Sequence, residues 1–99
     1  MATFVTLVKF TEKGIKDIKD TCKRAADFKL SAKKMGVEIK EIYWCPGVYD
    51  GLMIFDAPSV EAASALTLDL AARGNVQTQT TRAFTASEME KILKMTGQA

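Results

Sequence analysis

The chain has 99 residues, of which 47% are hydrophobic and 26% charged, and its formal net charge at pH 7 is +2. This length suits one small domain, and 14 basic against 12 acidic residues lack the positive bias of a general nucleic-acid-binding protein. No apolar run approaches the roughly 20 residues of a membrane span, and the first ten residues lack the pattern of a secretory signal. We therefore expect a soluble, cytoplasmic protein without membrane contact, in which Cys22 and Cys45 are reduced.

The chain contains no histidine, which removes the commonest general base and the commonest metal ligand. Ser-His-Asp or Cys-His catalysis within one chain, His/Cys zinc sites and proximal-His haem binding are therefore excluded. No glycine-rich nucleotide-binding loop follows a predicted strand. We expect no metal and no cofactor, so any chemistry has to use Asp, Glu, Lys, Tyr or Cys side chains.

The first third of the chain predicts a strand followed by a long helix. Residues 3–10 are dense in β-branched and aromatic residues, which is typical of a strand covered on both faces. Thr11 is a candidate N-cap and Gly36 a candidate stop, and Gly14 and Ser31 are the two places where a kink is expected. The helix has a predicted buried stripe with three-and-four spacing, namely Ile15, Ile18, Cys22, Ala25, Phe28, Ala32 and Met35.

The middle of the chain predicts an antiparallel hairpin of two strands, residues 37–45 and 49–57. Between them, the segment from Cys45 to Val48 fits a type II turn, because Pro46 presets φ and Gly47 tolerates a positive φ.

The last third of the chain predicts a helix, a strand and a shorter helix. Ser59 caps the first helix and Gly74 ends it, and residues 75–84 form the fourth strand. Thr85 and Glu88 are spaced as a capping box that opens the last helix.

The order of these elements, βαββαβ plus a terminal helix, predicts an α+β, ferredoxin-like sandwich with an antiparallel sheet in strand order 4-1-3-2. We expect one domain over residues 1–96 and a frayed tail over 97–99. Two helices cover one face of such a sheet, yet the first three strands carry apolar residues on both faces. The uncovered face predicts sheet-to-sheet packing of two copies as a dimeric α+β barrel.

Nearly the whole chain resembles the GYD-domain family of small bacterial proteins. The resemblance is carried by residues 6–11 with Gly14, by Tyr43-Trp44 with Gly47 and Tyr49-Asp50-Gly51, and by residues 74–76 with Thr78, Thr80, Arg82 and Phe84. It implies the ferredoxin-like fold of the dimeric α+β barrel group. It implies no particular activity.

One end of the predicted sheet collects most of the unusual side chains, because the hairpin turn, the end of the first strand and the start of the fourth meet there. The candidate ligand-binding residues at this end are Lys9, Phe10, Tyr43, Trp44, Tyr49, Asp50 and Gln77, with Asn75 beside them. Aromatic rings beside a Lys and an Asp suit a small polar or planar molecule. The alternative is structural: Asp50 binds turn or strand amides, Lys9 pairs with Asp50, and the aromatic rings pack at the rim.

Other charged and polar segments favour structural roles. The long helix has a net charge of +4, but acids at helical spacing, such as Asp20 with Arg24, indicate a solvated, salt-bridged face. The alternating polar residues of 76–84 suit an edge strand or, alternatively, the wall of a wet cavity between subunits. Cys22 is interpreted as a small buried residue, and Cys45 as a reactive thiol only if it is exposed beside a cation such as Lys9.

Three classes of function remain open. The leading hypothesis is a non-catalytic homodimer or higher homo-oligomer that binds a small molecule or a partner subunit near residues 43–51. The second is a cofactor-independent isomerase or oxygenase that uses Asp50, Lys9 or Tyr49 as acid or base. The third is a structural subunit of a larger assembly.

Overall fold

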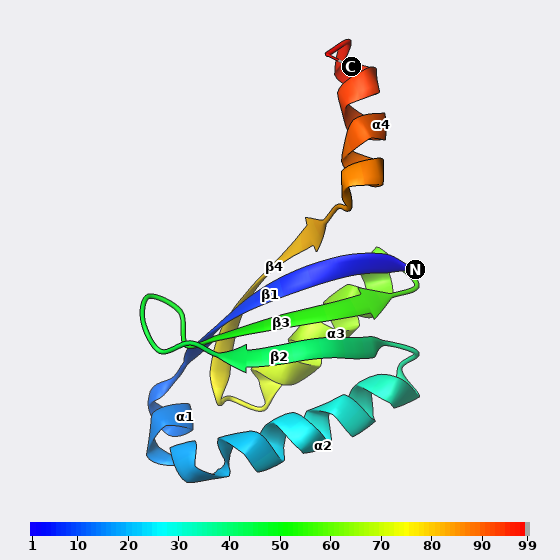
Figure 1. The fold of residues 1–99 in the computed structure, drawn as a ribbon. Helices are drawn as coiled ribbons and strands as arrows, with labels where there is room; N and C mark the ends of the chain where they lie inside the picture. The colour runs from blue at the N-terminus through cyan, green and yellow to red at the C-terminus, as the bar shows by residue number, and fades with distance from the viewer. Residues whose placement is uncertain (99) are drawn as a thin grey trace.

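The computed structural model describes residues 1–98 as a four-stranded antiparallel sheet with two long helices against it and a third helix projecting away (Figure 1). The elements are β1 (Ala2–Phe10), α1 (Glu12–Lys16), a 3₁₀ turn (Ile18–Asp20), α2 (Thr21–Lys34), β2 (Glu38–Trp44), β3 (Gly51–Ala57), α3 (Val60–Ala72), β4 (Val76–Ala83) and α4 (Ala86–Thr96). The strand order β2-β3-β1-β4 is the predicted order read from the other edge. The ferredoxin-like fold predicted from the sequence is therefore confirmed.

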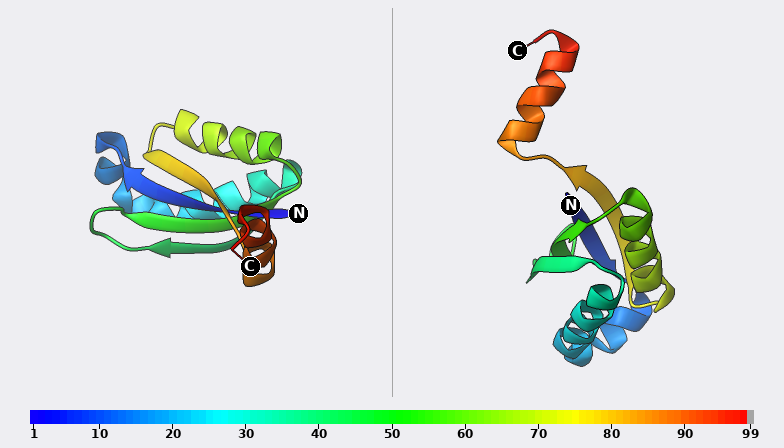
Figure 2. Two further views of the ribbon diagram at one scale, coloured as in Figure 1. Left: turned by 90° about the horizontal axis from the view of Figure 1, so that it is seen from above. Right: turned by 90° about the vertical axis from the view of Figure 1, so that its right-hand side faces the viewer.

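The core lies between the sheet and the helices α2 and α3, which cover the same face (Figure 2). Alternate residues of β1 and β3 point into it, and the rings of Phe4 and Phe55 stack there with centroids 5.4 Å apart. The buried members of this core are Phe4, Phe28, Ala32, Val37, Met53, Phe55, Ala57, Ala63 and Leu66. The period-two alternation leaves the other residues of the same strands on the uncovered face.

The uncovered face of the sheet, called the open face below, has an apolar centre. Val5 and Leu7 of β1 pair with Ile54 and Leu52 of β3 across the two middle strands. All four are half-buried, because neighbouring strands shield their sides while no element of residues 1–98 covers them (Figure 2).

The predicted long helix is broken, and the prediction of one continuous helix was wrong. Helix α1 ends at Lys16, and the chain turns through Asp17 before α2 begins at Thr21. Contacts distant in sequence impose this break: the Thr11 amide donates to the Asn75 carbonyl at 3.1 Å, and the Thr11 hydroxyl donates to the Gly74 carbonyl at 2.6 Å. Because α1 is fixed to the start of β4, the chain must change direction before α2 can pack on the sheet.

The predicted buried stripe is correspondingly shorter than expected. Phe28 and Ala32 are buried and Ala25 is half-buried, as predicted. The remaining members of the stripe are exposed: Ile15, Ile18, Cys22 and Met35. The break rotates the first residues away from the sheet, so the interpretation of Cys22 as a buried small residue was also wrong.

The hairpin connection differs from the predicted type II turn. Positive φ occurs only at Gly36, Gly74 and Gly97 among residues 1–98, so Gly47 does not take the conformation that a type II turn requires. Instead, residues 45–50 form a longer loop, closed by a hydrogen bond of 3.0 Å from the Cys45 amide to the Asp50 carbonyl. The Pro-Gly pair bends this loop without making a tight turn.

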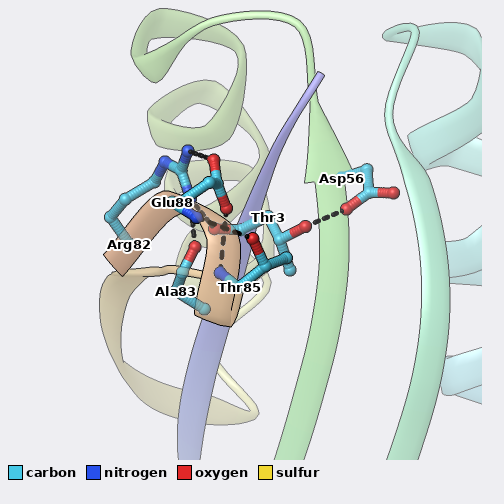
Figure 3. A network of polar contacts seen from close by, with 6 residues as sticks. All are labelled: Thr3, Asp56, Arg82, Ala83, Thr85 and Glu88. Atoms are coloured by element: carbon cyan, nitrogen blue, oxygen red, sulfur yellow. Dashed lines mark hydrogen bonds and ion pairs between the residues drawn. The ribbon is translucent and has the colours of Figure 1, made fainter. Parts of the chain in front are cut away.

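Helix α4 projects from the body and is anchored at its first turn (Figures 1 and 3). The predicted capping box of Thr85 and Glu88 is confirmed, and Arg82 Nη2 pairs with the Glu88 carboxylate at 2.8 Å. The pKa of Glu88 is lowered to about 2, mainly by the hydrogen bond from the Thr85 amide and next by the hydrogen bond from Arg82. At the other end, Gly97 closes the helix in a left-handed conformation; of the predicted frayed tail, residue 99 lies outside the described residues.

Candidate functional site

A cavity of about 150 Å³ lies between α2 and the covered face of the sheet, at the end that carries the hairpin loop. Most of its wall is apolar. The apolar lining comes from Val8, Phe10, Ala25, Phe28, Ile42, Met53, Leu70 and Val76. Because these residues belong to β1, α2, β2, β3, α3 and β4, the cavity is a product of the whole sandwich. It lies on the helix-covered face of the sheet.

Asp50 borders this cavity and connects the hairpin loop to β1. Its carboxylate Oδ2 accepts a hydrogen bond from the Phe10 amide at 2.9 Å and lies 3.6 Å from Lys9 Nζ. In the opposite direction, the Asp50 amide donates to the Val8 carbonyl at 2.8 Å. The side chain is only 14% exposed. These are the contacts expected if Asp50 has a structural role, in which it binds a strand amide and pairs with Lys9.

The aromatic residues of the hairpin separate onto the two faces of the sheet. Trp44 borders the cavity, and its indole N–H donates to the Thr21 hydroxyl at the start of α2 at 3.0 Å. Tyr43 also borders the cavity, but its pairing with Leu52 assigns its ring to the open face. The hydrogen bond that the Tyr43 hydroxyl donates to the Glu41 carboxylate raises the pKa of Tyr43, and the negative charge of Glu41 raises it further.

Three of the predicted site residues lie away from the cavity. Lys9 and Gln77 face each other across β1 and β4, where both are exposed. The Tyr49 hydroxyl donates to the Gln79 side chain at 3.1 Å, on the open face. The predicted set therefore divides: Phe10, Tyr43, Trp44 and Asp50 border the cavity, whereas Lys9, Tyr49 and Gln77 do not. Asn75, at the start of β4, also borders it.

Two arginines that the sequence analysis did not select border the cavity. The Arg73 guanidinium lies 5.2 Å above the Phe28 ring and pairs with Asp69 at 3.0 Å. Arg24 does not pair with Asp20, contrary to our expectation. Its Nη1 donates to the Asp17 carbonyl at 2.7 Å, and its Nη2 is buried without a hydrogen-bond partner. One sequence signal was available: Arg24 lies four residues before Phe28 and therefore shares its helix face.

The other predicted features have these positions. Cys45 is exposed in the hairpin loop, and Lys9 Nζ donates to the Gly47 carbonyl of that loop at 3.4 Å. Strand β4 is an edge strand, as the favoured interpretation of its polar residues required.

Within residues 1–98, no three His, Cys, Asp or Glu side chains are grouped as metal ligands would be. No helix in this part of the chain combines the length and apolarity of a membrane span.

Comparison with protein families supports the resemblance noted in the sequence. The family model described as GYD domain matches residues 4–93, a range that runs from β1 into α4 and includes the whole hairpin. No curated protein matches the chain. Since the family match covers nearly all of the chain, the protein belongs to the GYD domain family.

Proposed function

We propose that this protein binds a small molecule in the cavity between α2 and the sheet. The cavity itself carries the proposal. Its volume of about 150 Å³ is enough for a benzene ring. The space opens to solvent on one side, where Tyr43 and Trp44 are exposed, so water reaches its apolar wall. A ligand with a compact apolar part would remove that wall from water.

Binding is favoured over catalysis by the state of Asp50. A general base needs a carboxylate oxygen that can reach the substrate proton. Oδ2 of Asp50 is instead engaged by the Phe10 amide and by Lys9, and Tyr49 lies outside the cavity. The three residues considered for an isomerase or oxygenase therefore do not converge on this cavity.

We also propose that the protein is a homodimer formed through the open face. The apolar centre around Val5, Leu7, Leu52 and Ile54 gains its remaining burial when a second sheet packs on it at about 10 Å. A second copy is the favoured occupant because the centre of this face carries only apolar side chains, which a second identical centre complements. Asp56, at the edge of the face, is neutralised by Lys40 at 3.2 Å.

The cavity can be tested with two neighbouring alanines of α2. Ala25 borders the cavity whereas Ala26 is exposed, so Ala25→Phe fills the space and Ala26→Phe adds the same ring outside it. The only tryptophan of the chain, Trp44, borders the cavity and reports binding by fluorescence. We expect small aromatic fragments to alter Trp44 emission in the wild type and in Ala26→Phe, but not in Ala25→Phe.

Circular dichroism shows whether each variant is folded, and Ala25→Leu is the milder replacement if the phenylalanine is not accommodated. Equal fragment binding by the wild type and a folded Ala25→Phe would place binding outside the cavity. Absence of binding to the wild type across the fragment set would refute the proposed function.

The dimer can be tested by placing a charge on the open face. Leu7→Lys should convert the protein to a monomer in sedimentation experiments, because a lysine in the middle of a sheet-to-sheet interface would be buried without a partner. Leu68→Lys is the matched control, since Leu68 is 69% exposed on α3. A monomeric wild type would refute the dimer, and a mass above that of a dimer would support the assembly alternative.

A further inference from the structure

We propose that the ligand is a small monocarboxylate with a compact apolar body, whose carboxylate pairs with Arg24. This inference rests on the proposed small-molecule function and specifies the chemistry of its ligand. It starts from an unusual feature of the cavity: a positively charged donor beside an apolar space has no partner for one of its nitrogens.

Arg24 borders the cavity, and one side of its guanidinium has no acceptor. Nη1 donates to the Asp17 carbonyl at 2.7 Å, which fixes the side chain against the break between α1 and α2. Nη2 is buried and finds no acceptor among residues 1–98. A buried donor left unsatisfied is destabilising, and more so when the group is charged. An acceptor supplied by a ligand would remove this cost.

The other charged residues that border the cavity are already paired. Asp27 pairs with Lys23 at 3.0 Å, Asp50 with Lys9 at 3.6 Å, and Arg73 with Asp69 at 3.0 Å. Arg24 takes part in none of the ion pairs found among the described residues. The cavity therefore has one positive charge in excess, which matches one negative charge on the ligand.

The shape of the site favours a carboxylate. A guanidinium presents its donors in a planar fork that fits the two oxygens of a carboxylate. The volume of about 150 Å³ limits the buried body to about the size of a benzene ring, and Phe28 and Trp44 provide aromatic surface around it. Nucleoside phosphates carry more charge than one unpaired arginine balances.

Benzoate and benzyl alcohol test this inference, because they share a ring and differ in charge. We expect calorimetry and Trp44 fluorescence to give the wild type at least tenfold tighter binding of benzoate. Arg24→Gln should weaken benzoate about tenfold to a hundredfold, as expected for a charge-assisted hydrogen bond, and leave benzyl alcohol within about twofold. Lys29→Gln, an exposed cation of the same helix, should change neither.

Circular dichroism shows whether each variant is folded. Arg24→Lys keeps the charge but not the planar fork, and it should bind benzoate with an affinity between those of the wild type and Arg24→Gln. Equal affinity of the wild type for both probes, or benzoate binding unchanged in Arg24→Gln, overturns the carboxylate inference and leaves the cavity function standing. Failure of both probes to bind the wild type contradicts the proposed function together with the inference.

Discussion

Removing the Asp50 carboxylate should destabilise the fold, because this group satisfies the Phe10 amide and holds the hairpin loop against β1. In Asp50→Ala, the half-buried Phe10 amide loses its acceptor at 2.9 Å. We take about 1–2 kcal/mol for this loss, the lower half of the range for an unsatisfied buried donor. The ion pair with Lys9, whose side chain is 49% exposed, adds at most about 1 kcal/mol.

The conservative replacement separates these two contributions. Asp50→Asn keeps an oxygen that can accept from the Phe10 amide and loses only the ion pair, so its cost should be about 0–1 kcal/mol. For a domain of this size, about 1 kcal/mol shifts the melting temperature by about 4–8 °C. We therefore expect Asp50→Ala to melt at least about 4 °C below the wild type, with Asp50→Asn between them.

Thermal unfolding followed by circular dichroism measures both variants, and Lys9→Met completes the comparison. Lys9→Met should resemble Asp50→Asn, since each removes one partner of the same ion pair. If Asp50→Ala instead melts within a degree or so of the wild type, the carboxylate does not support the loop and becomes available for a ligand. That result would refute the structural role assigned here.

Two further predictions concern glycine and a carboxylate. Gly14→Ala should destabilise the fold strongly, because a Cβ there would collide with the Asn75 carbonyl oxygen. Gly47→Ala is the control and should melt like the wild type, because a Cβ at Gly47 has no neighbour closer than 3.7 Å. Equal melting temperatures of the two variants would contradict this prediction. Glu88 should titrate near its pKa of about 2 when its carboxyl is followed by NMR, so its stabilising effect is full above about pH 4.5 and is lost as the pH falls towards 2. In Arg82→Met the titration midpoint of Glu88 should rise, because the Arg82 hydrogen bond is lost. A midpoint near 4.5 in the wild type would show that the Glu88 carboxylate is unpaired.

Local signals in the sequence predicted the ends of several elements correctly. The Ser59 cap, the stop at Gly74 and the capping box at Thr85 are all present. Each depends on side chains within a few residues, so no tertiary information is needed. The sheet order followed in the same way from the order of elements and the handedness of crossovers.

The wrong predictions have tertiary causes. Gly14 marked a weak point three residues before the break at Asp17, but a glycine alone does not end a helix. The break depends on the attachment of Thr11 to Gly74 and Asn75, which the sequence does not show. The Pro-Gly pair suits a type II turn by itself. Asp50, however, is hydrogen-bonded to β1 through its amide and its carboxylate, and these bonds hold residues 45–50 in a longer loop than a type II turn.

The candidate site was predicted in part. Topology placed Phe10, Trp44 and Asp50 at one end of the sheet, and these residues do meet at the cavity. The sequence could not show that the space lies under α2, since the faces of a helix are assigned by packing. For the same reason Arg24, one of many cations on that helix, was interpreted as part of a solvated face.

The most direct test of the central claim is native mass spectrometry of the protein isolated from its own source, with gentle and strong activation compared. We predict a dimer that carries a small mass under gentle activation and releases it under strong activation, with accurate mass identifying a monocarboxylate. A bare monomer under the gentlest conditions would contradict both the interface on the open face and the occupied cavity.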